Sequence, residues 1–368
     1  MGGSLNKLLV LHDSRLFGGH ELMLERFLPR LLSQGPFTEV RFVFHQENER
    51  MVQLISTFGE AVVPCPMRFA NGRGDPFIGY FRYPYRQMIK QLFESYRPDR
   101  TLLVQGRIES TAVPIMAAPS DAYLVSYMPM AHARSLIGPQ PFGDAVRRPL
   151  YRRLNRVIVP SPTVAEQVRQ AGGGPDIRVV RNVVDPPPRA DQAEARARLH
   201  VDPKRRVALM IGRLDTRQKG IDRLLAAIER DRAALRNWQF VVVGQGPGAQ
   251  FVAEMAVRYP ELDILQRGWT DEANAYLAAA DILLLPSRWE GVPLVMLEAL
   301  AYDLPVLASD LPVFREYLPR HMICDYETGS LSVLLERALS GGGRAESKYA
   351  LDSLATSSEA FLNAVTAK

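Results

Sequence analysis

Short apolar runs alternate with amphipathic stretches along most of this chain, and this alternation constrains the fold more than any other feature. The alternation is most regular in the second half. There the expected strands are Val207–Ile211, Gln239–Val243, Asp263–Gln266, Ile282–Leu285 and Pro305–Ala308, and the expected helices between them are Ile221–Leu235, Ala249–Tyr259, Glu272–Ala279 and Leu294–Ala301. Strands that alternate with helices in this way predict a parallel sheet with helices on both faces.

The first half shows the same alternation less regularly. Its expected strands are Lys7–His12, Val40–Phe44, Ala61–Val63, Thr101–Val104, Ala122–Tyr127 and Val157–Pro160, with helices such as Glu21–Leu32, Tyr85–Tyr96 and Val164–Ala171 between them. A chain of 368 residues is too long for one ordinary core and suits two domains. We therefore expect an α/β protein made of two Rossmann-like, doubly wound domains.

A stiff segment separates the two halves. Pro186, Pro187 and Pro188 lack the N–H groups that a central strand needs, so the first sheet must end before them. We expect an N-terminal domain over residues 1–185 and a C-terminal domain over residues 186–345. A last helical stretch at about 346–366 follows three glycines, and residues 346–368 are expected to cross back onto the first domain.

Composition excludes several classes of protein. No run approaches the ~20 apolar residues that a membrane-spanning helix requires, and the N-terminus lacks a secretory leader, so we expect a cytoplasmic protein. Cys65 and Cys324 match no redox or metal-ligand spacing and are interpreted as structural thiols. No nucleic-acid partner is expected.

Positive charge is concentrated in the first half. Residues 1–188 carry 23 Lys or Arg and 16 Asp or Glu, a net charge of +7, whereas residues 189–368 carry 22 and 24, a net charge of −2. A basic first half suits an anionic acceptor or peripheral contact with the inner, anionic face of a membrane, and an arginine-rich solvated surface is the alternative. The expected contact is a basic helical stretch that contains Arg147, Arg148, Arg152, Arg153 and Arg156.

The strongest chemical signal is the turn between a buried strand and the helix that follows it. Strand Ile282–Leu285 is apolar on both faces, and the chain then turns at Gly291 and enters a helix near Pro293. Proline suits the first helical position, because the N–H there has no intrahelical partner. The free N–H groups of Leu294 and Val295 lie at the positive end of the helix dipole, which predicts a pyrophosphate site.

Two carboxylates flank this turn. Glu290 lies just before it, and Glu298 lies one helical turn inside. A carboxylate beside a phosphate site is repulsive unless it binds neutral hydroxyl groups, so the diols of a sugar and a ribose are natural partners. The alternative interpretation is a loop charge and a surface helix residue.

The segment from Glu290 through Gly291, Val292, Pro293 and Leu294 to Glu298 resembles the Glu–seven residues–Glu signature of the retaining glycosyltransferases of family 4, which have the GT-B fold. The resemblance implies two Rossmann-like domains that face a central cleft. It also implies metal-independent, retaining transfer from a nucleotide diphosphate sugar to a carbohydrate or lipid-linked acceptor, as in bacterial polysaccharide, glycolipid or glycoconjugate synthesis. By the same resemblance Glu290 contacts the donor sugar and Glu298 the ribose.

A pair of cations extends the resemblance. Gly212-Arg213-Leu214 followed by Lys219-Gly220 is similar to a family segment whose arginine and lysine hold the diphosphate. Two fixed cations at the end of a strand stabilise the charge that a leaving nucleoside diphosphate gains. Lys219 and Arg213 are therefore expected to be catalytic without a metal cofactor, and a solvated loop pair is the alternative.

Other turns also match the family. Gly244 and then Gly268 with Trp269 follow two of the expected strands and are counted with the donor-binding residues, and Ser309, Asp310 and Glu316 resemble the tail of the signature. Asp303 departs from the usual glycine, but aspartate tolerates the left-handed backbone conformation better than most residues.

The first domain carries fewer signals. Gly18-Gly19-His20-Glu21 resembles the family's glycine turn at the start of the first helix, which approaches the donor phosphate and the acceptor. His132 is the expected catalytic histidine, although its distance from the preceding strand is not the one typical of the family. An ordinary loop histidine is the alternative.

Three other functions remain open. Gly244-x-Gly246-x-x-Ala249 resembles a dinucleotide fingerprint, but Leu265-Gln266-Arg267 stands at the end of the next strand, where a dehydrogenase needs an acidic residue. A GT-B sugar-nucleotide epimerase or hydrolase would act without an acceptor. A non-catalytic sugar-nucleotide-binding subunit would bind its ligand without turnover.

Overall fold

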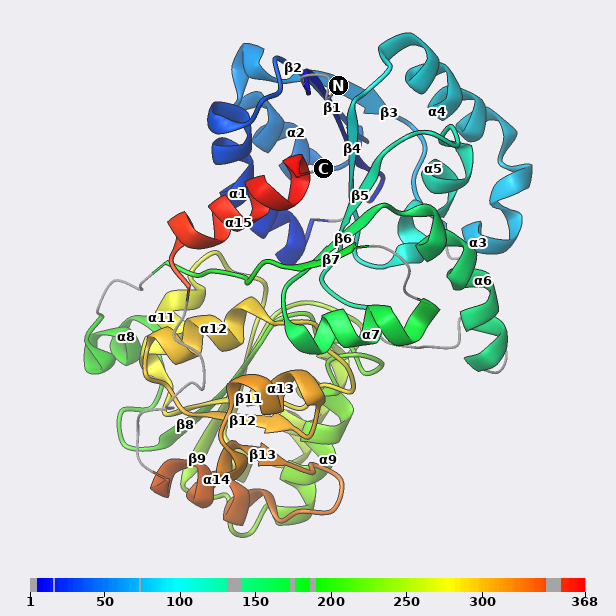
Figure 1. The fold of residues 1–368 in the computed structure, drawn as a ribbon. Coiled ribbons are helices and arrows are strands. Elements are labelled where there is room, and N and C mark those ends of the chain that lie inside the picture. Colours follow the sequence, from blue (N-terminus) through cyan, green and yellow to red (C-terminus); the bar gives the residue numbers. More distant parts are fainter. Residues whose placement is uncertain are drawn as a thin grey trace. The chain divides into compact units, whose positions relative to one another are not determined.

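The chain divides into two compact units. One contains Met1–Val183 with Asp352–Lys368, and the other contains Val184–Leu351. The computed structural model, drawn in Figure 1, describes residues 5–15, 17–72, 74–131, 140–172, 176–185, 190–341 and 352–367. The segment Pro186–Pro188 and most of the glycine run before the last helix lie outside the described residues.

The first unit is built on a parallel sheet. Its strands are β1 (Lys7–His12), β2 (Glu39–His45), β3 (Val63–Met67), β4 (Arg100–Val104), β5 (Leu124–Tyr127), β6 (Arg156–Val159) and β7 (Asp176–Val179). They lie in the order β3-β2-β1-β4-β5-β6-β7, and Leu8 of β1 is opposite Val40 on one side and Arg100 on the other. The strand order doubles back beside β1, as in a doubly wound fold.

Two expectations for this sheet need correction. The strand expected at Ala61–Val63 begins only at Val63, because residues Gly59–Ala61 form a single 3-10 turn. Pro64 and Pro66 obscure the strand in the sequence, yet they are tolerated because β3 is an edge strand. Strand β7 was not expected, since its residues are mostly exposed and show no apolar run.

Helices cover both faces of this sheet. One hydrophobic core joins α4 (Tyr83–Tyr96), α5 (Ala112–Ala117), α6 (Gln140–Arg153) and α7 (Pro162–Gly172) to one face. On the other face α1 (Gly19–Gln34) packs beside α15 (Leu354–Thr366), as Figure 1 shows. The rings of Phe27 and Phe361 stack at 5.1 Å, and both contact Tyr127 of β5 edge-on. The remaining helices of the unit are α2 (Glu49–Ser56) and α3 (Asp75–Ile78).

Two of the expected surface arginines are structural. Arg156 lies in β6 rather than in a helix, is 2% exposed, and donates to Asp176 at 2.8 Å and to the carbonyl groups of Ala364 and Ala367 at 2.8 and 2.9 Å. It therefore binds carbonyl groups that the end of α15 leaves without helical partners. Arg147 is also buried, with its Nε 2.5 Å from Glu109 Oε1. The expectation of one exposed basic stretch is wrong for these two residues.

A buried carboxyl group lies at the end of β1. Asp13 is 1% exposed and accepts hydrogen bonds from Asn71 at 3.1 Å and from the hydroxyl of Tyr85 at 3.0 Å. Burial raises the pKa of Asp13 to about 7, despite these two hydrogen bonds. Nothing in the sequence pattern distinguished this residue.

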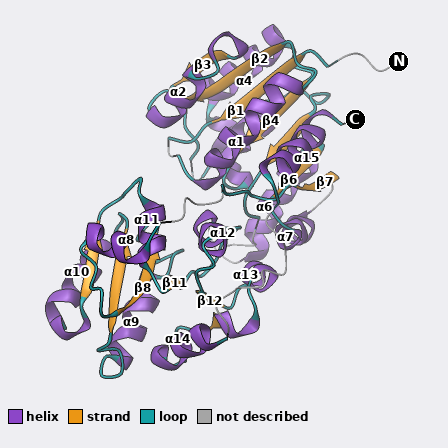
Figure 2. Cartoon of the chain, turned by 90° about the vertical axis from the view of Figure 1, so that its left-hand side faces the viewer, coloured by secondary structure: helices purple, strands orange, loops and turns teal. Residues whose placement is uncertain are grey.

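The second unit repeats the architecture. Its strands are β8 (Arg206–Ile211), β9 (Trp238–Val243), β10 (Ile264–Arg267), β11 (Ile282–Leu285), β12 (Val306–Ser309) and β13 (Ile323–Cys324), all parallel in the order β10-β9-β8-β11-β12-β13. One face packs on α8 (Gln192–Leu199), α11 (Ala273–Ala279), α12 (Leu294–Ala301) and α13 (Pro312–Tyr317). The other face packs on α9 (Ile221–Asp231), α10 (Ala249–Arg258) and α14 (Leu331–Ser340). Figure 2 shows this layering of helices and strands.

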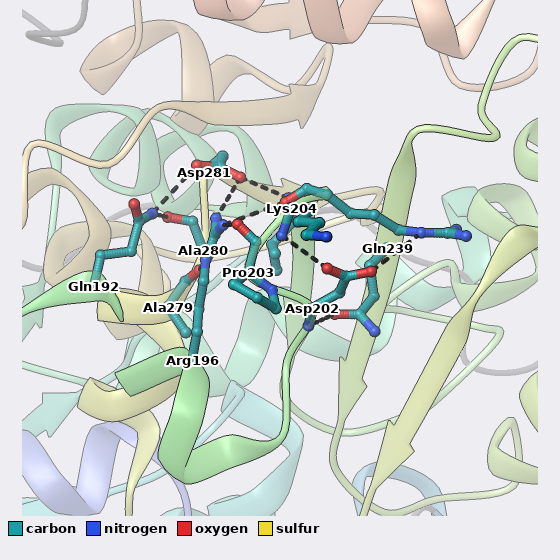
Figure 3. Close-up of polar contacts among 11 residues, drawn as sticks. Gln192, Arg196, Asp202, Pro203, Lys204, Gln239, Ala279, Ala280 and Asp281 are labelled. Atoms are coloured by element: carbon teal, nitrogen blue, oxygen red, sulfur yellow. Dashed lines mark hydrogen bonds and ion pairs between the residues drawn. The ribbon is translucent and has the colours of Figure 1, made fainter. Parts of the chain in front are cut away.

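A polar cluster fixes the amino-terminal edge of this second sheet (Figure 3). Asp281, just before β11, accepts hydrogen bonds from the backbone N–H of Val207 at 2.6 Å and from Arg196 at 2.7 Å. Arg196 of α8 also donates to the carbonyl group of Ala279, and Gln192 donates to that of Ala280. The cluster therefore joins α8 and the end of α11 to the starts of two strands, and leaves the carboxyl edge of the sheet open to carry a site.

Asp303 adopts the conformation that its position requires. It follows α12 with a φ of +56°, and the next N–H, from Leu304, bonds back to the carbonyl group of Ala299 at 2.9 Å. This left-handed turn at a helix C-terminus usually uses glycine. The expectation that aspartate is tolerated here is confirmed.

None of the described helices is both long and apolar enough to cross a bilayer. Cys65 and Cys324 are free thiols.

Replacing Arg156 should destabilise the first unit. We expect Arg156→Ala to lower the free energy of unfolding by about 2–4 kcal/mol, because it leaves buried carbonyl groups of α15 without donors. Urea denaturation followed by circular dichroism measures this loss. Arg152→Ala, at an exposed position of α6, is the control and should cost less than about 0.5 kcal/mol. Equal losses in the two variants would contradict the structural role of Arg156.

Replacing Asp13 should change how stability depends on pH. Its carboxyl group has a pKa of about 7 in the folded chain and ionises near pH 4 when unfolded, so the folded state holds an extra proton between these values. The free energy of unfolding therefore falls as the pH rises through this window. Between pH 5 and pH 8, the wild type should lose about 2–3 kcal/mol relative to Asp13→Asn, which is neutral throughout. Parallel stability profiles for the two proteins would exclude a buried, protonated Asp13.

Candidate functional site

The residues singled out in the second unit lie in loops that leave the carboxyl ends of its strands. Parallel strands bring these loops to one edge of the sheet, where ligands of open α/β sheets bind. The expected residues at this edge are Gly212, Arg213 and Lys219 after β8, Gly244 after β9, Gly268 and Trp269 after β10, and Glu290, Gly291, Val292, Pro293, Leu294 and Val295 after β11. Strands β8 and β11 are neighbours, so their loops meet.

Close approach of the backbone explains two of the glycines. Gly244 has a φ of +143°, and a Cβ atom there would lie 1.8 Å from the carbonyl oxygen of Gly212. Gly220 has a φ of +67°, and a Cβ atom there would lie 2.1 Å from the carbonyl oxygen of Pro286. Any larger side chain would push these loops apart. The glycines therefore let the loops after β8, β9 and β11 pack backbone against backbone.

A buried ion pair joins the loops after β8 and β11. The Nζ atom of Lys219 lies 2.6 Å from Oε1 of Glu290, whose side chain is only 5% exposed. The same oxygen accepts a hydrogen bond from Ser287 at 2.9 Å. From the residues that the structure describes, the second carboxylate oxygen of Glu290 accepts only a long contact of 3.5 Å, from Gln218. One oxygen is therefore committed to the protein, and the other is weakly engaged.

Arg213 is connected to the same pair. Its guanidinium group donates to the side-chain oxygen of Gln218 at 2.7 Å, and Gln218 in turn contacts Glu290. We call these five residues the Lys219 network: Arg213, Gln218, Lys219, Ser287 and Glu290. Two cations and one carboxylate leave the network with a net positive charge, which favours an anionic ligand. Arg213 is exposed, so it is accessible to such a ligand.

A second, bidentate ion pair holds the loop after β8 in place. Both nitrogens at the tip of Arg288 lie 2.7 Å from the carboxylate oxygens of Asp222, and the backbone N–H of Arg288 donates to the carbonyl group of Gln218 at 2.8 Å. The hydrogen bonds from Arg288 lower the pKa of Asp222. Paired guanidinium and carboxylate groups of this geometry are directionally rigid. The pair therefore holds in place the backbone of the loop that carries Lys219.

Helix α12 begins beside the Lys219 network. Pro293 is its N-cap, with extended backbone angles, rather than its first helical residue, and the helix begins at Leu294 as expected. The N–H groups of Leu294 and Val295 have no hydrogen-bond partner in the described part of the chain. Unpaired N–H groups in the first turn of a helix attract anions. The first turn of α12 therefore supplies donors to the edge at which Arg213 and Lys219 lie.

Glu298 occupies a different environment from Glu290. Its neighbours Met296, Leu297, Ala299 and Leu300 are buried in the core, whereas Glu298 is half-buried. Burial raises the pKa of Tyr302, and the charge of Glu298 raises it further. Glu298 is the one ionisable side chain of α12, on a helix whose other residues are apolar.

The other expected residues of this unit lie at the ends of β10 and β12. Gly268 and Trp269 follow β10, at the edge of the sheet two strands from β8, and Trp269 is 60% exposed. Asp310 is exposed and forms an ion pair with Arg315. Ser309, in contrast, is buried, and its hydroxyl has no hydrogen-bond partner within the described ranges. The structure thus brings together Arg213, Lys219 and the turn after β11, whereas Trp269 follows a strand two positions from β8 in the sheet.

In the first unit, the glycine turn before α1 is hydrogen-bonded to a side chain of that helix. The N–H of Gly18 donates to Oε2 of Glu21 at 2.7 Å, and Oε1 of Glu21 contacts His12 at 2.8 Å and His20 at 2.9 Å. Burial alone would raise the pKa of Glu21, but the two histidines outweigh it and hold that pKa below its usual range. Gly19 is the first residue of α1. The N–H of Gly18 is therefore not free to bind a phosphate.

The two histidines and Glu21 form the one cluster with metal-ligand proximity in the described ranges. Their separations are those of hydrogen bonds between a carboxylate and imidazole N–H groups. His132, the expected catalytic histidine, lies outside the described residues.

Several residues of the site gave no separate signal in the sequence. Gln218 lies within the segment from Gly212 to Gly220, and Ser287 and Arg288 lie just before Glu290, but their spacing alone did not identify them. Asp222 is in the first turn of α9, where acidic residues are common for reasons of helix stability. Their roles depend on contacts between loops far apart in the sequence.

The second unit matches a known family. Residues 205–335 match the family model described as Glycosyl transferases group 1. The mannosyltransferase LpsB of lipopolysaccharide core biosynthesis, from Rhizobium meliloti (strain 1021), is 30% identical over 135 residues, which are 35% of this chain and 38% of that protein. The chain aligns with only about a third of the length of the first curated relatives, between 31% and 38%.

Solved structures match over nearly the whole chain. The lipopolysaccharide outer core galactosyltransferase WaaB, in its apo form, superimposes with a TM-score of 0.66 over 98% of this chain and 99% of that one, at 17% identity. HepE of Anabaena in complex with UDP-glucose gives a TM-score of 0.68 over 98% and 95%, at 16% identity. At these identities the matches concern the fold. The chain therefore has the GT-B fold, and its residues 205–335 match the model of the glycosyl transferases group 1 family.

Proposed function

We propose that this chain transfers a sugar from a nucleotide diphosphate sugar to a hydroxyl group of a carbohydrate or lipid-linked acceptor, with retention of anomeric configuration. The observation that carries the proposal is the contact of Lys219 with the buried Glu290 beside the start of α12. It places a cation, a carboxylate and free helix N–H groups at one sheet edge. These are the groups needed for a diphosphate and for the hydroxyl groups of the attached sugar.

Different groups of the site would bind the different parts of the donor. Arg213, Lys219 and the N–H groups of Leu294 and Val295 would hold the diphosphate. The weakly engaged oxygen of Glu290 would accept hydrogen bonds from the sugar hydroxyl groups. Glu298, one turn further along α12, would bind the ribose. UDP-glucose bound to HepE, a protein of the same fold, supports a nucleotide sugar as donor.

The reaction would break the bond between the anomeric carbon and the diphosphate oxygen, and form a bond from the acceptor oxygen on the same face of the sugar. The leaving phosphate would take the proton of the acceptor hydroxyl. Its growing negative charge would be stabilised by Lys219 and Arg213, since cations fixed before the reaction need no reorganisation. This assignment uses no divalent metal and no nucleophilic side chain.

Relatives point to the synthesis of surface polysaccharides or glycolipids. LpsB is a mannosyltransferase of the lipopolysaccharide core, and WaaB is a galactosyltransferase of the outer core. We infer a role of the same kind for this chain. An epimerase or hydrolase of the same fold would act without an acceptor, and a non-catalytic subunit would bind the donor without turnover, so an assay with and without acceptor separates the three.

Replacing Lys219 should remove most of the activity. We expect Lys219→Ala to lower kcat/KM by about a hundredfold or more, because one of the two cations that stabilise the leaving group is lost. The measurement is release of nucleoside diphosphate in the presence of acceptor and EDTA, where the wild type should stay active. Arg217→Ala, at an exposed position of the same loop, is the control and should change kcat/KM by less than about twofold.

The loss must be separated from misfolding, because Lys219→Ala leaves the buried carboxylate of Glu290 without its cation. Lys219→Arg retains a positive charge beside Glu290 and should fold like the wild type. It should still lower kcat/KM, because a planar fork replaces a compact ammonium group. Full activity in a folded Lys219→Ala protein would overturn the assignment of the phosphate site.

A further inference from the structure

Large apolar side chains are concentrated on the surface of the first unit at one short segment. Of the twelve exposed large hydrophobic residues in the described part of the chain, four lie within residues 78–83. We call them the aromatic patch: Ile78, Tyr80, Phe81 and Tyr83, which are 54%, 59%, 84% and 68% exposed. The others are scattered singly or far apart, as is normal for a soluble surface.

The backbone under the aromatic patch is held firmly. Asp75, which is 2% exposed, accepts hydrogen bonds from the N–H of Gly72 at 2.8 Å and from Arg82 at 2.6 Å. Gly79 lies so close to α5 that a Cβ atom there would be 2.5 Å from a methyl carbon of Met116. The segment is therefore held on both sides of Tyr80, by the contact of Gly79 with α5 and by the ion pair of Arg82 with Asp75.

Arginines contact the rings of Tyr80 and of the buried Tyr85 beside the patch. Arg86 donates to the carbonyl group of Tyr80 at 2.9 Å, and its guanidinium group lies 5.0 Å from the centre of the Tyr80 ring. Arg82 lies 5.1 Å from the centre of the buried Tyr85 ring. Aromatic rings and cations thus alternate along the segment that joins α3 to α4, two helices that Figure 1 shows on the outer right-hand side of the first unit.

The surroundings of the aromatic patch are basic. Residues 75–90, which carry the patch and the first two turns of α4, contain Arg82, Arg86 and Lys90, and their one acidic residue is the buried Asp75. Lys90 is exposed, two turns along α4 from Tyr83. Glu94 is also exposed but lies near the far end of the helix. An anionic surface would therefore meet several cations and little repulsion.

We propose that the aromatic patch docks the first unit onto the interfacial region of an anionic lipid bilayer. Tyrosine and phenylalanine rings enter the boundary between headgroups and acyl chains, and flanking Lys and Arg side chains bind anionic headgroups. Six residues are far too few to span a bilayer, so the contact is peripheral. This surface differs from the arginine stretch expected from the sequence, of which Arg147 and Arg156 are buried. The proposal does not depend on the proposed reaction.

Vesicle co-sedimentation with the full chain tests the proposal. The protein should sediment with vesicles of phosphatidylcholine and phosphatidylglycerol in a ratio of about 7:3, more weakly with pure phosphatidylcholine, and more weakly as salt screens the charges. Phe81→Ser combined with Tyr83→Ser should weaken binding to the anionic vesicles by about tenfold or more. Lys90→Gln should weaken binding to anionic vesicles alone.

Val257→Ser is the matched control, because Val257 is also 84% exposed but lies on α10 of the second unit. It should bind vesicles like the wild type. All replaced side chains are exposed, so circular dichroism should show unchanged folding. The proposal is overturned if the wild type does not sediment with anionic vesicles, or if the double variant binds as well as Val257→Ser. It is also overturned if light scattering shows a dimer that the double variant loses, since a second copy would then cover the patch.

Discussion

The pairing of Lys219 with a nearly buried Glu290 is the constraint on which the rest of the second unit's carboxyl edge depends. A carboxylate removed from water is costly unless a cation and further donors replace its solvent. Here Lys219 and Ser287 supply them at 2.6 and 2.9 Å. The side chain of Lys219 must therefore extend from the loop after β8 to the turn after β11. This contact requires the backbones of the loop and of the turn to be fixed relative to each other.

Several features of the unit serve that contact. Gly220 allows the loop after β8 to touch the carbonyl group of Pro286, and the bidentate pair of Arg288 with Asp222 fixes the same two segments a second time. Helix α12 starts immediately afterwards with unpaired N–H groups. At the opposite end of the sheet, Asp281 and Arg196 close the amino edge. These contacts give the second unit a fixed frame with one polar, positively charged edge. Such an edge suits the binding of a diphosphate better than acid–base catalysis by two glutamates.

The sequence predicted the second unit closely where apolar runs were unbroken. Strand β11 and helix α12 lie at the residues expected, because both are apolar and bounded by proline or glycine. Strand β3 was misplaced because Pro64 and Pro66 interrupt the pattern, and β13 was missed because it has only two residues. Arg156 was misassigned for another reason. A charged residue is expected to be exposed from sequence alone. The pattern could not show that Arg156 donates to carbonyl groups more than 200 residues later in the chain.

The candidate site was predictable as a set of residues but not as a network. Lys219 and Glu290 were both expected to bind the donor, through a family resemblance, yet their contact joins positions 71 residues apart that no local pattern connects. The same holds for Gln218. In the first unit the resemblance was less informative, since the N–H of Gly18 is used by Glu21 rather than offered to a ligand.

Thermal denaturation with nucleosides and their diphosphates tests the central assignment most directly. A ligand at a hundred times its Kd stabilises the state that binds it by about 2.7 kcal/mol. The account predicts that one member of a panel of UDP, GDP, ADP and dTDP raises the Tm of the wild type. The matching nucleoside should not raise it, and the rise should vanish in Lys219→Ala. If no diphosphate raised the Tm, or if the nucleoside or the variant gave the same rise, the diphosphate site at the Lys219 network would be contradicted.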